Sequence, residues 1–154
     1  MTDTTGAALY RSVRKQDFPN GPIVDDHAVV GVLYPSFEPT DIGKGRTRPP
    51  DVAVITDKHG QWVIPDGGGT SLFDKKVIKV FKEKYWWFFT IPKGTDIPGS
   101  LRVRYTGRHE AFEAEHYQIE PAAGRMTVAA YKGALDNLAR NAVVKAYEKA
   151  HGGA

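Results

Sequence analysis

The sequence predicts a mixed α/β protein of the α+β class, and three observations support this prediction. Its 154 residues are enough for one hydrophobic core but too few for two ordinary domains. Short apolar or alternating segments recur between glycine- and proline-rich turns, which is typical of strands. The longest helical pattern comes last, over residues 128–150. We therefore expect residues 1–154 to form a single domain, with disorder limited to residues 1–8.

Composition and charge narrow the class of protein further. Hydrophobic residues make up 41% and charged residues 25%, which are ordinary globular values. The absence of cysteine excludes disulfides, a thiol nucleophile and thiolate metal sites, and it fits a reducing compartment. A formal charge of +3 favours anionic ligands such as nucleotides. We expect no signal peptide and no membrane segment, because no apolar run approaches the roughly 20 residues that a span needs.

The first half of the chain predicts several short strands. Residues 8–13 alternate in polarity, and residues 52–56 and 61–64 form a hairpin around Lys58, His59 and Gly60. An apolar run at 27–34 leads into residues 35–51, which are dense in Pro, Gly, Arg and Lys. We expect this segment to be an exposed loop or lid that carries function.

The middle of the chain predicts a break, a strand, a helix and another strand. Glycines at 67–69 interrupt the chain before a strand at 70–73. Asp74 resembles an N-cap for a short basic helix whose apolar face would include Val77 and Phe81. Residues 86–91 are continuously apolar and aromatic, which indicates a buried central strand.

The last third predicts two strands and the long helix. Residues 101–105 and 116–119 alternate in polarity, and Thr127 is placed to cap the helix. Apolar residues recur along the helix at spacings of three and four, so one stripe faces a sheet. Gly133 costs this helix about 1 kcal/mol.

The glycine-rich segment that ends in Thr70 and Ser71 is the most informative local motif. Its glycines would let backbone amides approach a ligand, and two hydroxyls follow. A P-loop is excluded because Gly69 stands where that motif needs lysine, and the Gly-x-Ser-x-Gly pattern of serine hydrolases is absent. A glycine turn that simply feeds a strand is the alternative interpretation.

Arg11 and His116 are further candidates for chemistry. If Arg11 points from its strand into a cleft, it would bind a phosphate through two parallel hydrogen bonds. If it faces solvent instead, it would have no chemical role. His116 would donate to a phosphate or ribose, or act as an acid or base, although it could equally be structural. Glu113 and Glu115 would face the same side if extended, and a solvated charged turn is the alternative.

Aromatic and histidine residues elsewhere receive weaker assignments. Residues 85–89 could stack bases, but a core role is favoured because alternate side chains of a central strand are buried on both faces. No metal is expected, because histidines at three further positions lack metal-ligand spacing: His27, His59 and His109.

Five segments, taken in order, resemble the Tse-two-type toxin family, whose members are exported by type VI secretion. The similar segments are LYR at 9–11, PDGGGTSLFD at 65–74, IPKGTDIP at 91–98, HY at 116–117 and LDNLARNA at 135–142. The resemblance runs from about residue 9 to 152 and is weakest over 18–50. It implies an ADP-ribosyltransferase-like fold, with two small packed β-sheets forming an NAD cleft, peripheral helices and a long C-terminal helix.

The same resemblance implies site residues by position. Arg11 matches the arginine that holds the NAD phosphates, Gly69, Thr70 and Ser71 the strand that frames the nicotinamide ribose, and His116 the histidine of the third motif. Arg11, Ser71 and His116 are the expected catalytic residues. The usual transferase glutamate has no clear match, which leaves Glu113 or Glu115 as candidates.

The function implied is that of a cytosol-acting toxin that uses NAD as a substrate. It would transfer ADP-ribose to a macromolecular acceptor, act in the cytoplasm of the producing or target cell after possible type VI delivery, and be neutralised by a small acidic immunity protein. Related domains occur in bacteria and fungi. Two alternatives stay open: an NAD glycohydrolase toxin, and a nucleic-acid-targeting toxin that uses the Lys75 to Lys84 face without NAD.

Overall fold

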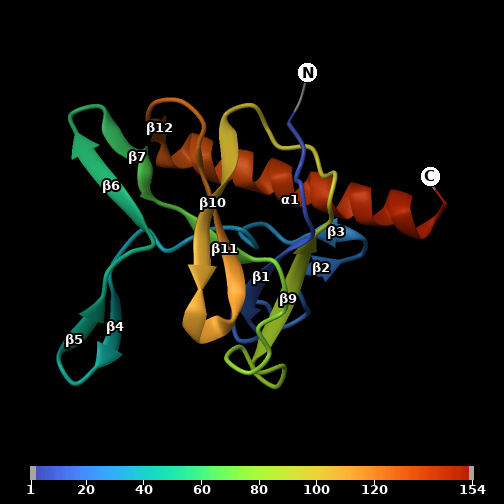
Figure 1. Ribbon diagram of the computed structural model, residues 1–154. Helices are drawn as coiled ribbons and strands as arrows, with labels where there is room; N and C mark the ends of the chain where they lie inside the picture. The colour runs from blue at the N-terminus through green and yellow to red at the C-terminus, as the bar shows by residue number, and fades with distance from the viewer. Residues whose placement is uncertain (1–2, 153–154) are drawn as a thin grey trace.

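The computed structural model describes residues 3–152 as two antiparallel sheets packed against one long helix, together with two small hairpins (Figure 1). The five-stranded sheet has the order β10-β11-β8-β1-β9, with β1 Leu9–Arg14, β8 Thr70–Phe73, β9 Trp86–Ile91, β10 Leu101–His109 and β11 Ala114–Pro121. The three-stranded sheet has the order β12-β7-β6, with β6 Val52–Asp57, β7 Gly60–Gly68 and β12 Met126–Thr127. The hairpins are β2 Ile23–Val24 with β3 His27–Ala28, and β4 Thr40–Gly43 with β5 Arg46–Arg48.

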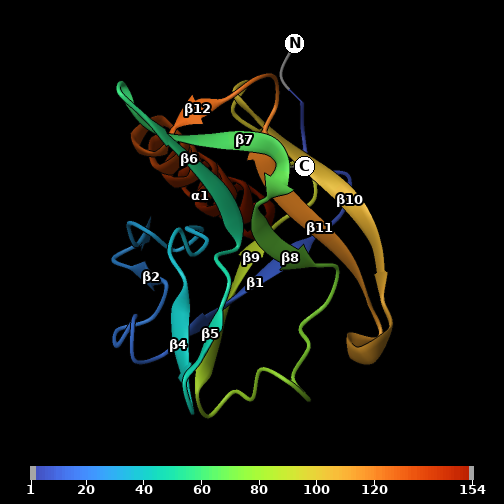
Figure 2. The same ribbon diagram turned by 90° about the vertical axis from the view of Figure 1, so that its left-hand side faces the viewer.

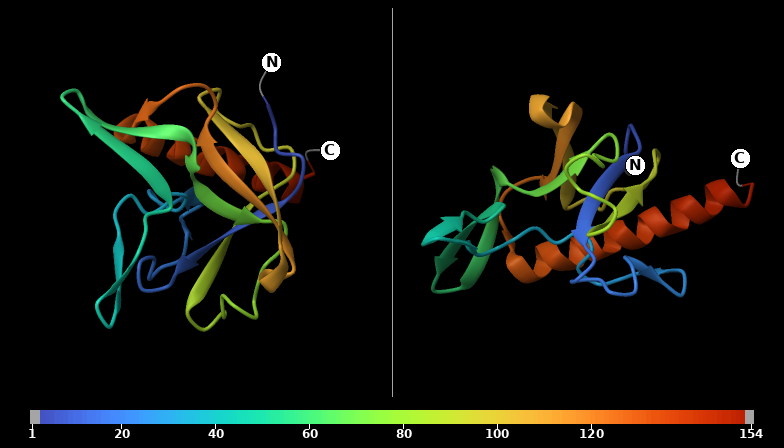
Figure 3. Two further views of the ribbon diagram at one scale, coloured as in Figure 1. Left: turned by 60° about the vertical axis from the view of Figure 1, so that its left-hand side comes forward. Right: turned by 90° about the horizontal axis from the view of Figure 1, so that it is seen from below.

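Helix α1, Val128–Ala150, packs against one side of the sheets through its buried residues between Tyr131 and Ala142, and its C-terminal end projects beyond the strands (Figure 3). Thr127 caps it as expected, because its hydroxyl accepts a hydrogen bond from the Ala130 amide at 3.0 Å. Tyr131, Leu135 and Leu138 have no exposed surface and join strand residues in one apolar cluster. The predicted helix and its inward stripe are confirmed.

The strand predictions are confirmed except for the position of β9. The predicted hairpin is β6 with β7, and the other predicted strands are β1, β8, β10 and β11. Strand β9 lies at the edge of its sheet rather than in the centre. Its apolar character has a different cause: Phe89 and Ile91 are buried in the core cluster, and the Trp87 indole donates to the Phe18 carbonyl at 2.8 Å.

Residues 74–85 form a series of turns and not the predicted basic helix. Asp74 does not cap a helix, because its carboxylate accepts the Glu115 amide at 3.0 Å and its own amide donates to the Glu115 carbonyl at 3.2 Å. Val77 is buried with Phe73 and Ala114 in a small separate cluster. Tertiary contacts with β11 therefore override the weak helical pattern. The prediction of several peripheral helices is wrong for residues 3–152, where α1 is accompanied only by the 3-10 turn Glu110–Phe112.

The expectation of disorder over residues 1–8 is not met by residues 3–8. Thr5 is 4% exposed, and its hydroxyl donates to the Pro92 carbonyl at 2.7 Å and accepts the Thr95 amide at 3.0 Å. Thr4 forms an isolated bridge with Asp96. The chain start is thus tied to the loop after β9. Residues 1–2 lie outside the described residues.

A buried carboxylate joins the two sheets. Glu120 on β11 has no exposed surface and accepts hydrogen bonds from Arg102 at 2.8 Å and Arg104 at 2.6 Å. It also accepts the Asp66 amide of β7 at 2.8 Å. Burial alone would raise the pKa of Glu120, but the hydrogen bonds from Gln118, Arg102, Asp66 and Arg104 outweigh it and lower the pKa to about 2.

No helix among residues 3–152 combines the length and the apolarity that a membrane crossing requires.

Candidate functional site

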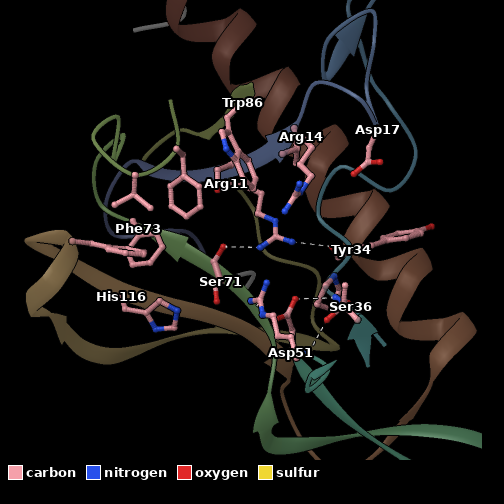
Figure 4. Close-up of a pocket in the computed structure, with 18 of the residues that line it drawn as sticks. Arg11, Arg14, Asp17, Tyr34, Ser36, Asp51, Ser71, Phe73, Trp86 and His116 are labelled. Atoms are coloured by element: carbon pink, nitrogen blue, oxygen red, sulfur yellow. Dashed lines mark hydrogen bonds and ion pairs between the residues drawn. The ribbon is translucent and has the colours of Figure 1, made fainter. Parts of the chain in front are cut away.

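A polar cleft of about 1360 Å³ opens over strands β1 and β8. Its walls come from segments far apart in the sequence. The β4–β5 hairpin lies on one side, and the end of β10 with the start of β11 lies on the other (Figure 2). Arg11, Ser71 and His116 all line it, so the structure brings together the three residues expected to be catalytic (Figure 4).

Arg11 lies at the floor of the cleft with its guanidinium enclosed. It leaves β1 on the same side as Leu9 and Val13, which are both in the core. One terminal nitrogen donates to the Ser71 carbonyl at 3.2 Å and the other to the Tyr34 carbonyl at 3.0 Å. Its Nε atom is buried and has no hydrogen-bond partner. Burial lowers the pKa of Arg11, an effect that the nearby Asp51 partly opposes, but arginine stays cationic in proteins.

Helix α1 holds the Tyr34 carbonyl in place. The Asp136 carboxylate accepts the Tyr34 hydroxyl at 2.7 Å and the Gly31 amide at 3.0 Å. Burial and then the hydrogen bond to Asp136 raise the pKa of Tyr34 to about 12. The helix residue thereby positions an acceptor for Arg11 without lining the cleft itself.

Ser71 and His116 lie on one face of the five-stranded sheet. The register pairs His116 with Phe73 and Gln118 with Ser71 across β11 and β8, so these four side chains share a face. The imidazole packs on Phe73 with ring centroids 5.1 Å apart, and its Nδ1 atom contacts the Thr106 hydroxyl. Burial, and then the neighbouring His109, lower the pKa of His116, which favours the neutral form of the ring.

Gly69 and Thr70 do not line the cleft. Thr70 has no exposed surface, and its hydroxyl donates to the Leu33 carbonyl at 2.6 Å. A Cβ atom on Gly69 would lie 2.3 Å from the Ile119 carbonyl oxygen, and one on Gly68 would lie 2.0 Å from the Asp51 carbonyl oxygen. The glycines are thus needed for close backbone packing where the chain enters β8. This agrees with the alternative interpretation of the motif, a glycine turn that feeds a strand.

Asp51 is a cleft residue that the sequence did not indicate. Its carboxylate accepts the Ser36 amide at 2.9 Å and pairs with Arg48 at 3.2 Å, while its own amide donates to the Ser36 hydroxyl at 2.8 Å. The Gly69 amide donates to its carbonyl at 3.1 Å. These contacts depend on tertiary structure, and the only sequence signal was that residue 51 ends the loop at 35–51.

The two candidate glutamates are held outside the cleft. Glu113 has a φ of 53° and pairs with Lys79 at 2.9 Å, and that hydrogen bond lowers the pKa of its carboxyl group. Glu115 accepts the Tyr105 hydroxyl at 2.6 Å and Arg108 at 2.8 Å, which lower its pKa in the same way. Because Glu113 is left-handed and not extended, the two carboxylates do not form the parallel pair that the spacing allowed.

Comparison with known proteins identifies the reaction class of this protein. A family model described as "Tse2 ADP-ribosyltransferase toxin" matches residues 5–147, so the protein is a toxic ADP-ribosyltransferase. The chain belongs to the Tse2 ADP-ribosyltransferase toxin family: Toxin Tse2 of Pseudomonas aeruginosa is 32% identical to it over 159 residues, which cover 97% of this chain and 96% of that protein.

Proposed function

We propose that the cleft binds NAD with its pyrophosphate against Arg11 and its nicotinamide ribose beside Ser71 and His116. The enclosed guanidinium carries this assignment. The Ser71 and Tyr34 carbonyls use one donor on each terminal nitrogen and fix the orientation of the guanidinium, while each terminal nitrogen keeps a second N–H for a ligand. A rigid arginine with spare donors at the floor of a cleft is suited to a pyrophosphate.

Positioning and exclusion of water would supply most of the rate gain. Cleavage of the nicotinamide bond leaves a cation-like sugar, and the β4–β5 hairpin would enclose it against the wall formed by β10 and β11. The neutral His116 would accept the proton of the attacking group. Gly69 and Thr70 would act on the site indirectly, because they fix the backbone of β8 and Asp51.

We further propose that the protein acts in a cytosol, with type VI secretion as the route of delivery, and that a small acidic immunity protein blocks it. Four arginines line the cleft against three aspartates. Arg48 and Arg108 are already paired with Asp51 and Glu115, so a partner that covers the mouth of the cleft would meet a small excess of positive charge, carried mainly by Arg11 and Arg14. Because water could attack the same sugar, NAD hydrolysis is the alternative reaction at this site. A toxin that does not use NAD is disfavoured by the family.

Substitution of Arg11 by lysine tests the NAD assignment. Arg11→Lys keeps the charge but loses the planar fork, so we expect nicotinamide release from labelled NAD to fall about 30- to 150-fold, the equivalent of about 2–3 kcal/mol. Arg140→Lys, at an exposed position of helix α1 outside the cleft, is the matched control and should leave the rate unchanged. Full nicotinamide release by folded Arg11→Lys protein would overturn the assignment.

A further inference from the structure

A second, smaller groove of about 360 Å³ adjoins the NAD cleft. It is lined by Arg14, Lys15, Gln16, Lys84, Tyr85 and Trp86, which we call the basic groove. Arg14, Gln16 and Trp86 also line the cleft, so the two hollows are neighbours at the end of β1 and the start of β9. Figure 4 shows Arg14 and Trp86 beside Arg11.

The backbone fixes the shape of the basic groove. Arg14 is paired with Trp86 in the β1–β9 register, and the Lys15 amide donates to the Tyr85 carbonyl at 3.0 Å. The Trp86 amide donates to the Lys82 carbonyl at 3.0 Å, which closes the turn before β9. The groove therefore exists before any ligand arrives, which lowers the ordering cost of binding.

Cations and aromatic rings alternate along this groove. The Arg14 guanidinium lies 5.1 Å from the Trp86 ring centroid, and the Lys84 ammonium lies 5.5 Å from that of Tyr85. Tyr85 is 59% exposed, so its ring is open to a ligand. Within residues 3–152, no carboxylate pairs with the three cations that line the groove, Arg14, Lys15 and Lys84, or with Lys82 in the turn just before it.

We propose that the basic groove binds a single-stranded nucleic acid and that this strand is the acceptor of ADP-ribose. Unpaired cations would follow the phosphates while bases stack on Tyr85, the combination that binds single strands without sequence preference. Proteins also use exposed tyrosines at their interfaces, so the choice of nucleic acid rests on the placement of unpaired cations beside the stacking ring within one groove. The inference rests on the proposed use of NAD and names the acceptor class.

The transfer balances without any further reactant. The bond between the ribose C1′ atom and the nicotinamide nitrogen breaks, and nicotinamide leaves with the electron pair. A nitrogen or oxygen of the nucleic acid, carried from the basic groove into the cleft, forms the new bond to C1′. The proton it loses passes to His116 or to water.

Two groove variants and one control test the proposal. Lys82→Glu with Lys84→Glu reverses charge at two exposed positions, Tyr85→Ala removes the stacking ring, and all three residues lie outside the NAD cleft. Lys58→Glu with Lys149→Glu makes the same charge change at exposed positions elsewhere. Binding is read by fluorescence anisotropy of a labelled oligouridylate of about 12 nucleotides without NAD. Transfer is read with labelled NAD in a lysate followed by separate nuclease and protease digestion.

We expect both groove variants to weaken RNA binding at least tenfold, while the control keeps it within about twofold. The slope of log affinity against log salt should become less steep by about 1 to 2 for the double lysine variant. Transferred label should be nuclease-sensitive and fall in both variants, with nicotinamide release in the absence of acceptor unchanged.

Three results would overturn the inference. The first is RNA binding and label transfer by the groove variants at the level of the control. The second is label that only protease removes and that the groove variants also lose, which would make the partner a protein. The third is no NAD turnover by the unaltered protein, which would remove the proposed function and the acceptor role together. The RNA-binding measurement needs no NAD, so it distinguishes this result from the first.

Discussion

Thr70 and Ser71 show how one strand divides its side chains between stability and chemistry. Because side chains alternate along β8, Thr70 points into the core and donates to the Leu33 carbonyl, whereas Ser71 lines the cleft. The two hydroxyls looked equivalent in the sequence. Only the pairing of β8 between β1 and β11 distinguishes them.

Substitution at these two positions should separate stability from activity. Thr70→Val leaves the Leu33 carbonyl without its donor in the core, so we expect the free energy of unfolding to fall by about 1–3 kcal/mol. NAD turnover per folded molecule should persist. Ser71→Ala should do the reverse, with unchanged stability and reduced nicotinamide release. Thermal denaturation and the release assay measure both; a large loss of activity in folded Thr70→Val would restore a direct binding role to Thr70.

His116 should give the activity an acid limit. Burial and His109 lower its pKa from the ordinary value of 6.5, so the neutral ring persists below the pH at which an exposed histidine charges. If this neutral form accepts the proton, nicotinamide release falls only as pH drops through a pKa below 6.5. The same shift makes protonation cost stability as pH falls below 6.5, since the unfolded chain binds the proton first. In His116→Gln, the acid limb of the pH–rate profile should disappear; an unchanged limb would assign it to another group.

At the scale of elements, the sequence predicts what depends on local pattern and misses what depends on neighbours. Helix α1 and the β6–β7 hairpin follow from spacing and turn residues alone. The edge position of β9 depends on sheet order, and the turns at 74–85 depend on the attachment of Asp74 to β11. Neither is encoded within the segment itself.

One substitution in α1 and one at its N-cap should change stability in opposite directions. Gly133 is exposed, and an added Cβ would meet no atom within 4 Å, so Gly133→Ala should stabilise the protein by up to about 1 kcal/mol. Thr127→Ala removes the cap on Ala130 and should cost about 1 kcal/mol. Urea unfolding measures both, and NAD turnover serves as the control because neither residue lines the cleft. Destabilisation by Gly133→Ala would contradict the open space around it.

At the scale of the whole molecule, the fold class and three cleft residues were predictable, but the enclosing walls were not. Arg11, Ser71 and His116 come from three predicted strands. Asp51 and the Tyr34 carbonyl reach Arg11's surroundings only through long-range contacts with β8 and α1. Such contacts leave no periodic trace in a single sequence.

The Glu120 junction should set the acid stability of the whole molecule. The pKa of Glu120 lies at about 2 in the folded protein against 4.5 for an ordinary glutamate, so its contribution is present above pH 4.5. That contribution, roughly 3 kcal/mol at neutral pH, is lost as pH falls from about 4.5 to 2.

Glu120→Gln tests this junction. The variant should be less stable at pH 7 and should lose less stability than the unaltered protein between pH 5 and pH 3, as measured by urea unfolding at each pH. Glu83→Gln, the same change at an exposed position in the turn before β9, is the control and should leave the acid profile unchanged. Parallel stability curves for the two proteins would place the acid sensitivity elsewhere.

The clasp between Ser36 and Asp51 makes the β4–β5 hairpin an exchangeable part. Three hydrogen bonds join these two residues: the Ser36 amide to the Asp51 carboxylate at 2.9 Å, and the Asp51 amide to the Ser36 hydroxyl at 2.8 Å and carbonyl at 3.1 Å. The segment between these two residues is therefore closed at its base, so a longer loop there would add little to the entropic cost of loop closure. A graft between residues 37 and 50 would reshape one wall of the cleft while Arg11 and β8 stay in place, so this is where the toxin's selectivity could be re-engineered independently of its scaffold.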